Sequence, residues 1–198
     1  MAVKGDAGHR RTQAERRAST RSALLAAARE LFAEKGFAGA GREEIVERAG
    51  VTRGAMYHHF DSKEALFQAV YEEVEHEMLG RIAEAAITAP EPLEQLRRGA
   101  MAYLDVAAND DVRRICLLDA PSVLSTEVRR ELAERYGLGL VRESLALCMA
   151  DGAIARQPVE PLAHVLLAAL LEAATLVADG ADRAEVDAVV ERMLDGLR

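Results

Sequence analysis

Apolar residues recur at spacings of three and four along nearly the whole chain, and this periodicity constrains the fold more than any other feature of the sequence. The pattern is typical of amphipathic helices that bury one face. No convincing run of alternating β-branched residues occurs, aromatic residues make up only 4% of the 198 residues, and tryptophan is absent. A β-sandwich or a β-barrel is therefore disfavoured. The sequence predicts an all-α protein.

Glycine, proline and acidic turn residues divide this pattern into about nine helices. Gly36 is expected to end the first helix, and Pro90 and Pro92 break the chain after a long fourth helix. The segment Asp61-Ser62-Lys63-Glu64 matches a capping box, with the Asp61 carboxylate as the expected cap of that fourth helix. The expected helices cover residues 20–35, 42–49, 53–60, 63–86, 93–108, 111–119, 125–151, 159–179 and 184–197.

The charge of the chain is divided unevenly between its two ends. The formal net charge is −8, but residues 1–63 carry a net +4 and the remainder a net −12. A basic N-terminal part is typical of a chain that meets a polyanion there. We expect a flexible basic arm over residues 1–18, although such an arm could merely aid solubility. A first domain is then expected at 19–73 and a second at 74–198.

The composition also limits where the protein works. Cys116 and Cys148 are the only cysteines and form no CxxC pair, so a disulfide scaffold is excluded. No apolar run reaches 18 residues without a charge, which predicts no membrane span. The first 21 residues hold no apolar stretch of the kind a secretory signal needs. These observations predict a cytoplasmic protein.

Two short amphipathic helices joined by Ala49-Gly50-Val51-Thr52 match a helix-turn-helix. Gly50 allows a positive φ at the tight turn, Val51 fills the small core, and Thr52 is a good N-cap for the second helix. That second helix would present Arg53, Gly54, Tyr57 and His58 outward, where their donors can reach phosphates or base edges.

The same region resembles the DNA-binding domain of the TetR/AcrR family of regulators. The resemblance runs from about residue 20 to 73 and is carried by Ala33-Glu34-Lys35-Gly36-Phe37, by Glu44 to Phe60, and by Ser62-Lys63-Glu64-Ala65-Leu66. Its most specific part is 49–66, with the glycine, Tyr-x-His-Phe and Lys-Glu-x-Leu elements at matching spacings. The resemblance implies that the chain binds double-stranded DNA. The residues that it implies face DNA are Thr52, Arg53, Gly54, Tyr57, His58 and Lys63, the last contacting a phosphate at a helix N-terminus.

The chain departs from the family pattern just before the helix-turn-helix. Ala40-Gly41 stands where a Thr or Ser pair is usual, so the hydroxyl contact to phosphate is in doubt. Arg42 could replace that contact with a charged one, or it could simply be solvated. Glu43 occupies a position where a basic residue is common, which would weaken nonspecific affinity.

The family's C-terminal helices form a dimer interface and an effector pocket, so we look for both in the second domain. The helix expected at 159–179 is apolar nearly all round and must be covered on more than one side. With the striped last helix it predicts a homodimer through a four-helix contact, the alternative being a purely intramolecular core. The expected interface residues are Leu162, Leu166, Ala169, Leu170, Ala173, Val186, Val190 and Met193.

Met, Cys and Leu on three of the expected helices are candidates for a pocket that adapts to apolar ligands, although each could equally be plain core. Asp119 and Glu172 lie among apolar residues, and a buried carboxylate there would favour a cationic ligand, unless an internal arginine or partial exposure satisfies it. The candidate pocket residues are Met101, Tyr103, Leu104, Cys116, Asp119, Leu140, Leu145, Cys148, Met149 and Glu172.

These expectations converge on a transcriptional regulator, with a repressor that binds a palindromic operator and is released by a small molecule as the leading hypothesis. No glycine-rich phosphate loop, GxSxG or HExxH motif is present, so no enzyme, metal site or cofactor is predicted. Two alternatives stay open. One is a helical ligand-binding protein or enzyme without specific DNA binding, and the other is a nonspecific DNA-compacting protein.

Overall fold

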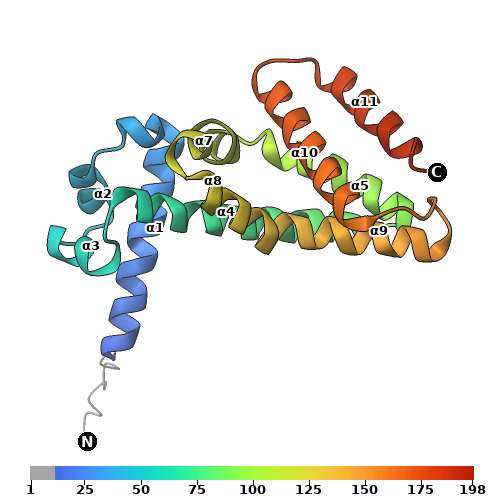
Figure 1. The fold of residues 1–198 in the computed structure, drawn as a ribbon. Helices are drawn as coiled ribbons and strands as arrows, with labels where there is room; N and C mark the ends of the chain where they lie inside the picture. Colours follow the sequence, from blue (N-terminus) through green and yellow to red (C-terminus); the bar gives the residue numbers. More distant parts are fainter. Residues whose placement is uncertain (1–11) are drawn as a thin grey trace, which may run out of the picture.

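The computed structural model describes residues 12–198, and in that range all regular secondary structure is helical, with no strand (Figure 1). The all-α prediction is confirmed, and contiguous elements merge into nine helical segments, as expected. The bounds are α1 (Gln13–Gly39), α2 (Arg42–Arg48), α3 (Arg53–His59), α4 (Lys63–Ala86), α5 (Pro92–Ala107), α6 (Asp110–Val112), the π-helix η1 (Arg113–Asp119), α7 (Ala120–Val123), α8 (Thr126–Ala133), the π-helix η2 (Glu134–Leu138), α9 (Gly139–Asp151), α10 (Val159–Ala178) and α11 (Arg183–Asp195).

One helix start and one helix cap differ from those expected. Helix α1 begins at Gln13, because Thr12 and Glu15 form a reciprocal capping box. Residues 13–18 therefore belong to this helix and not to a flexible arm, while residues 1–11 of the expected arm lie outside the described range. Helix α4 is capped by Ser62, whose hydroxyl accepts from the Ala65 N–H at 3.0 Å, and not by Asp61.

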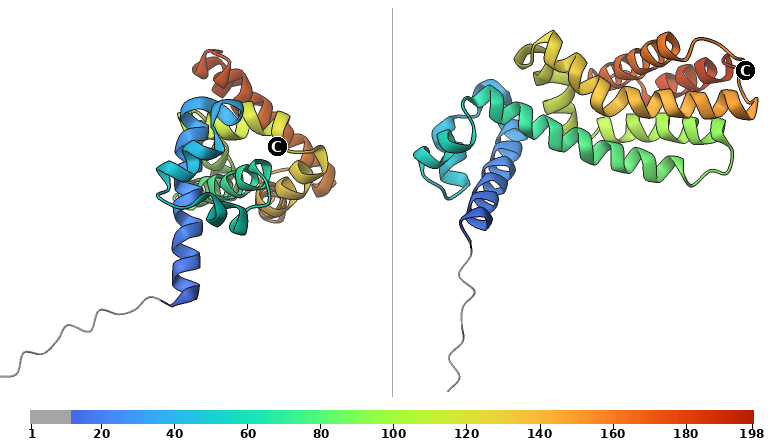
Figure 2. Two further views of the ribbon diagram at one scale, coloured as in Figure 1. Left: turned by 90° about the vertical axis from the view of Figure 1, so that its left-hand side faces the viewer. Right: turned by 60° about the horizontal axis from the view of Figure 1, so that its bottom comes forward.

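Helices α1, α2 and α3 gather at one end of the molecule, and α4 runs from that end into the body (Figures 1 and 2). In the body α4 packs along α5, and α5 packs in turn against α9 and α10. Helices α10 and α11 lie together at the other end of the molecule, where the C-terminus is found (Figure 1). Helix α4 is thus the element that extends from the three N-terminal helices to the middle of the body.

The buried side chains form two clusters, and the first crosses the expected domain boundary at residue 73. It includes residues of α1 to α4, such as Phe32, Met56 and Phe67, and continues into the body through Val112 and Ile115. The rings of Phe32, Phe37 and Phe67 pack within 5.2–5.8 Å of one another at its centre. The second cluster joins α5, α9, α10 and α11. The three N-terminal helices therefore share their core with the first part of the body.

Gly36 interrupts α1 with φ 70° and ψ 170°, a backbone conformation available almost exclusively to glycine. At this kink the chain lies directly against Arg114 of η1, so that a Cβ on Gly36 would collide with the guanidinium. Gly36 was expected to stop the first helix, and the structure adds that it also permits close packing of the α1–α2 junction against the body.

Helix α10 is long and apolar enough to span a membrane by length and composition alone, with a mean hydropathy of 1.8 over its most apolar stretch. Core helices of soluble proteins meet the same criterion. Only 28% of that stretch is buried within the chain, although the helix packs on α5, α9 and α11. Glu172 therefore does not make the helix too polar to meet the criterion for a membrane span. Much of the apolar surface of α10 is left uncovered within one chain.

We predict that Gly36→Ala lowers the free energy of unfolding by about 1–3 kcal/mol, because alanine is strained at this φ and ψ and displaces Arg114. Gly80→Ala is the matched control, since Gly80 lies within α4 in open space and alanine there should stabilise the helix by about 0.5–1 kcal/mol. Urea unfolding measures both. Equal and small effects of the two substitutions would contradict the role given to Gly36.

Candidate nucleic-acid interface and ligand cavity

Helix α3 presents a polar face to solvent because its apolar side chains are used inward. The turn before it is made by Gly50 at φ 64°, and the Thr52 hydroxyl caps the helix by accepting from the Ala55 N–H at 3.2 Å. Met56 and Phe60 are buried in the first cluster. The opposite face carries the residues predicted from the sequence, all exposed: Arg53, Gly54, Tyr57 and His58.

Arg42 joins this face through Tyr57. The Arg42 guanidinium donates to the Tyr57 hydroxyl at 3.3 Å, and Arg53 lies 6.0 Å from the centre of the same ring. Hydrogen bonding by Arg53, and then the charge of Arg42, lower the pKa of Tyr57. Arg42 is thus held beside the recognition helix, next to Gly41, which caps α2 without a side-chain hydrogen bond.

Glu43 opposes this positive charge. Its carboxylate lies 3.4 Å from the Arg53 guanidinium, and both side chains are largely exposed. An exposed pair of this kind contributes little to stability. It does, however, give Arg53 an acidic partner that any bound phosphate must replace.

Lys63 begins α4 and is half-buried. Its ammonium lies 4.3 Å from the centre of the Phe37 ring, a cation–π contact. Burial lowers the pKa of Lys63, with a further lowering from Arg42. Because the amino group stands at a helix N-terminus, free backbone N–H groups are available beside it for a phosphate.

Asp119 does not face a ligand cavity, which corrects the expectation from the sequence. Its carboxylate accepts from the Phe37 backbone N–H at 2.6 Å and from Arg114 Nε at 3.4 Å. An internal arginine and a backbone donor therefore satisfy this carboxylate. Asp119 thus joins the body to Phe37, the residue whose ring Lys63 contacts.

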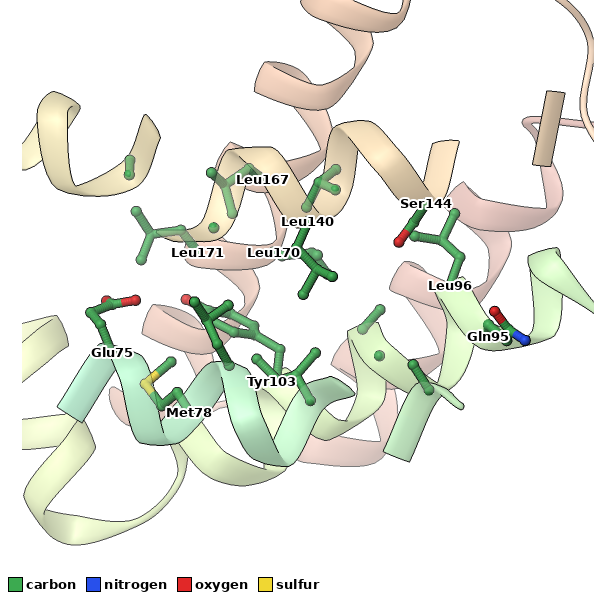
Figure 3. A pocket seen from close by; sticks show the side chains of 18 of the residues that line it. Glu75, Met78, Gln95, Leu96, Tyr103, Leu140, Ser144, Leu167, Leu170 and Leu171 are labelled. Carbon is green, nitrogen blue, oxygen red and sulfur yellow. The ribbon is translucent and has the colours of Figure 1, made fainter. Parts of the chain in front are cut away.

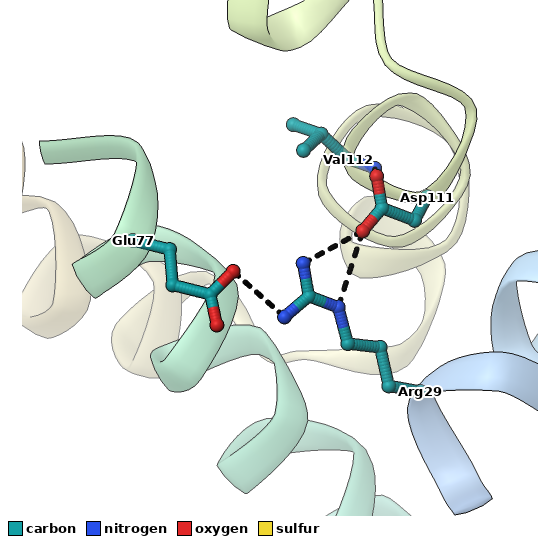
Figure 4. A network of polar contacts seen from close by, with 4 residues as sticks. All are labelled: Arg29, Glu77, Asp111 and Val112. Carbon is teal, nitrogen blue, oxygen red and sulfur yellow. Dashed lines mark hydrogen bonds and ion pairs between the residues drawn. The ribbon is translucent and has the colours of Figure 1, made fainter. Parts of the chain in front are cut away.

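A second polar link joins the same parts of the chain (Figure 4). Arg29 of α1 donates to the Asp111 carboxylate at 2.7 and 3.1 Å and to Glu77 of α4 at 2.8 Å. The other Asp111 oxygen accepts from the Val112 N–H at 2.8 Å. Burial opposes ionisation of Asp111, but these hydrogen bonds outweigh it and hold the pKa of Asp111 below its usual value.

A cavity of about 150 Å³ lies in the body between α4, α5, α9 and α10 (Figure 3). Of the candidate pocket residues, Tyr103 and Leu140 line it, and so does Leu170, which was expected at a dimer interface. Besides Asp119, the structure places seven candidates elsewhere. Leu104, Leu145 and Cys148 are buried in the second cluster, Met101 and Met149 pack against it, Cys116 packs against the first cluster, and Glu172 is exposed.

The carboxylate in the cavity wall is Glu75, which the sequence analysis missed. Glu75 lies on α4 between the lining residues Tyr71 and Met78, at helical spacing. Burial raises the pKa of Glu75, and a hydrogen bond from Tyr71 partly offsets this. An acidic residue in register with Tyr71, Met78 and Ile82 was the available signal, because these share the inward side of one helix.

The expected dimer residues are mostly part of the protomer's own core. Leu166, Leu170, Ala173, Val186 and Val190 are buried within the chain, which corrects their assignment to an interface, while Leu162, Ala169 and Met193 are half-buried. Other apolar side chains of the same two helices are exposed: Val165 at 64%, Leu176 at 46% and Val189 at 61%.

Glu134, Glu160 and His164 bring three potential metal-ligand atoms within 4.8 Å of one another on the surface of the body. Arg142 lies between the two carboxylates, at 2.7 Å from Glu134 and 2.8 Å from Glu160. The guanidinium therefore already neutralises this acidic group, which carries no argument for a metal.

Comparison with known proteins finds matches to both parts of the chain. Residues 24–70 match the family described as bacterial regulatory proteins of the tetR family, and residues 93–197 match the tetracyclin repressor-like C-terminal domain. A TetR-family transcriptional regulator from Pectobacterium atrosepticum has a similar structure, with a TM-score of 0.81 and 34% identity over 94% of this chain and 97% of that one.

The curated relatives include both transcriptional activators and transcriptional repressors. The transcriptional activator FasR of Mycolicibacterium smegmatis is 34% identical over 52% of this chain and 47% of its own length. The transcriptional repressor BepR of Brucella suis is 37% identical over 54% of this chain and 51% of its own length. The chain thus matches about half the length of these relatives.

We predict that Asp111→Asn destabilises the protein by roughly 1 kcal/mol at neutral pH, a low value for a charged hydrogen bond because both partners are partly exposed. Since the pKa of Asp111 is depressed, its contribution is complete above the unfolded value near 4 and is lost as the pH falls through the folded value.

The free energy of unfolding should therefore be measured from pH 7 to pH 2 for wild type and for Asp111→Asn. The difference between the two values should become smaller as the pH falls. The control is Asp110→Asn, which changes the same charge at an exposed position next to it. A difference that stays constant with pH would show that Asp111 does not act through its charge.

Proposed function

Because the chain belongs to the TetR family of bacterial transcriptional regulators, we propose that it is a ligand-responsive repressor that binds a palindromic operator as a homodimer. It works in the cytoplasm, where its operator is found, and it needs no cofactor. The observation that carries the proposal is the exposed face formed by Arg42, Arg53, Tyr57 and His58, with Lys63 at the edge of the same domain.

This face has the composition that a major groove requires. Arginine and tyrosine donors can reach base edges and phosphates, and Gly54 leaves space for close approach of the backbone to DNA. Arg42 takes the place of the missing hydroxyl pair at Ala40-Gly41, because it already lies against Tyr57 at 3.3 Å. The two arginines, with Lys63, supply the positive charge for phosphate contacts.

The proposed dimer is formed by the outer surfaces of α10 and α11. Val165, Leu176 and Val189 are exposed there, on two helices whose other faces pack in the protomer's core. A water-exposed apolar surface of this kind is typical of a protein–protein interface. Two copies related by a two-fold axis would cover it and would set two α3 helices against two half-sites.

The effector is proposed to act from the cavity through α4. This helix contributes Glu75 and Met78 to the cavity wall and starts at Lys63. A ligand that fits the cavity better in a conformation unable to bind both half-sites would lower operator affinity, and a typical coupling corresponds to about 5- to 150-fold. A ligand with equal affinity for both conformations would have no effect.

We predict that Tyr57→Ala weakens operator binding by about 5- to 150-fold per half-site while the helical content is unchanged. The operator is first obtained by selecting bound sequences from genomic fragments, and affinity is then measured by fluorescence anisotropy. His76→Ala, an exposed aromatic residue on α4, is the control and should bind like wild type.

Recovery of no preferred sequence in that selection would favour the alternative of a helical ligand-binding protein or a nonspecific DNA-binding protein. Unchanged affinity of Tyr57→Ala for a selected operator would remove Tyr57 from the interface.

We predict that Val165→Asp or Val189→Asp weakens dimerisation at least about 100-fold, because a carboxylate would be buried without a partner between the subunits. Ile87→Asp is the control, since Ile87 is 75% exposed at the end of α4 and does not belong to the apolar surface of α10 and α11. Sedimentation at micromolar concentration distinguishes the two results. A monomeric wild-type protein would refute this interface.

A further inference from the structure

Among the residues that the structure describes, one charged group lines the cavity in the body, Glu75, at one end of a largely apolar space. We propose that this cavity binds a linear alkylammonium, with the ammonium at Glu75 and the chain along the apolar wall. The inference rests on the proposed function, in that the ligand would be the effector, but binding itself can be tested without DNA.

Charge balance favours a cation. The wall holds no arginine, lysine or histidine among the residues that the structure describes, so Glu75 has no basic partner in the cavity. A carboxylate in apolar surroundings is costly unless it is paired and hydrogen-bonded. An alkylammonium brings a charge of opposite sign and three donors, and its chain adds apolar surface to be buried.

The groups around Glu75 cannot supply that charge. Tyr71 of α4 and Tyr103 of α5 line the same end of the cavity, and Cys116 of η1 lies close behind them. Burial raises the pKa of all three, with a contribution from the negative charge of Glu75, so they stay neutral. The Arg29 guanidinium, whose charge acts on Cys116, is engaged by Asp111 and Glu77.

The shape favours a linear chain. The residues that line the cavity on α4 run from Tyr71 to Ala86, a distance of about 22 Å along a helix. Figure 3 shows Glu75 and the Tyr103 hydroxyl together at one end, Gln95 and Ser144 at the other, and Leu140, Leu167, Leu170 and Leu171 between or beside them. Because these polar groups lie at the two ends and leucine side chains lie between or beside them, the arrangement fits a linear chain with a polar head group.

The test compares three probes of equal chain length: octylamine, octan-1-ol and octanoate. Isothermal titration calorimetry with the full-length protein at pH 7.5 should show octylamine binding about 10- to 100-fold more tightly than octan-1-ol, and octanoate more weakly than both. This comparison uses the wild-type protein alone, so it does not depend on whether a variant folds.

Glu75→Gln should remove the preference, weakening octylamine about 10- to 100-fold and leaving octan-1-ol unchanged or tighter. Glu84→Gln is the matched control, because it removes the same charge from an exposed position of α4 outside the cavity wall. It should bind octylamine like wild type.

The pH dependence gives an independent readout. An alkylamine stays protonated below about pH 10, so affinity should rise as the pH increases through the raised pKa of Glu75 and then level off. Glu75→Gln should show no such rise. Equal affinity for the three probes, preference for octanoate, or unchanged octylamine binding by Glu75→Gln would each overturn the proposal.

Operator release is measured separately, with the same three probes added to the protein–DNA complex. If octylamine binds the cavity but does not release the operator, the proposed effector role is contradicted, whereas the proposed class of ligand is supported. Release of the operator by octanoate alone would contradict the ligand class and support the regulator.

Discussion

The structure depends on one close contact between the α1–α2 junction and the π-helix η1. Gly36 allows the chain to lie against Arg114, and the next backbone N–H, that of Phe37, is held by the Asp119 carboxylate at 2.6 Å. On the inner side of this junction, Phe32, Phe37 and Phe67 pack together in a cluster that continues to Ile115. Because interiors are close-packed, such a contact transmits displacement from the body to the helix-turn-helix. The N-terminal helices and the body are therefore parts of one packed unit.

The sequence predicted the fold and the α3 face because both depend on local rules. Helical spacing, the Gly50 turn and the Thr52 cap act over a few residues, and the same local pattern places Met56 inward and Tyr57 outward. The cap of α4 was assigned wrongly for an equally local reason. Asp61 and Ser62 are both good caps, and neighbouring positions cannot be separated without the backbone geometry.

The cavity and the interface could not be predicted in the same way, since both depend on which sides of the helices meet. Asp119 and Glu172 looked informative because each stands among apolar neighbours in the chain, yet Asp119 turns to Phe37 and Glu172 to solvent. Glu75 is the acidic residue that shares a helix face with the cavity wall. On α10 and α11, periodicity identifies an apolar helix but does not tell which stripe is core and which is exposed. The sequence analysis therefore assigned Leu166, which is buried, to the interface and left out Val165, which is exposed.

The ion pair between Arg53 and Glu43 has a consequence for how salt acts on DNA binding. Each arginine that enters a phosphate contact normally displaces condensed counterions, and the logarithm of affinity then falls linearly with the logarithm of salt concentration. In the free protein the Arg53 guanidinium lies 3.4 Å from the Glu43 carboxylate. Arg53 must break this ion pair to contact a phosphate, and salt screens the attraction within the pair. Added salt therefore weakens the contact between Arg53 and phosphate and, at the same time, weakens the competing ion pair between Arg53 and Glu43. The slope of affinity against salt should then be shallower than a count of phosphate contacts implies, which would keep binding more even as the ionic strength of the cell changes.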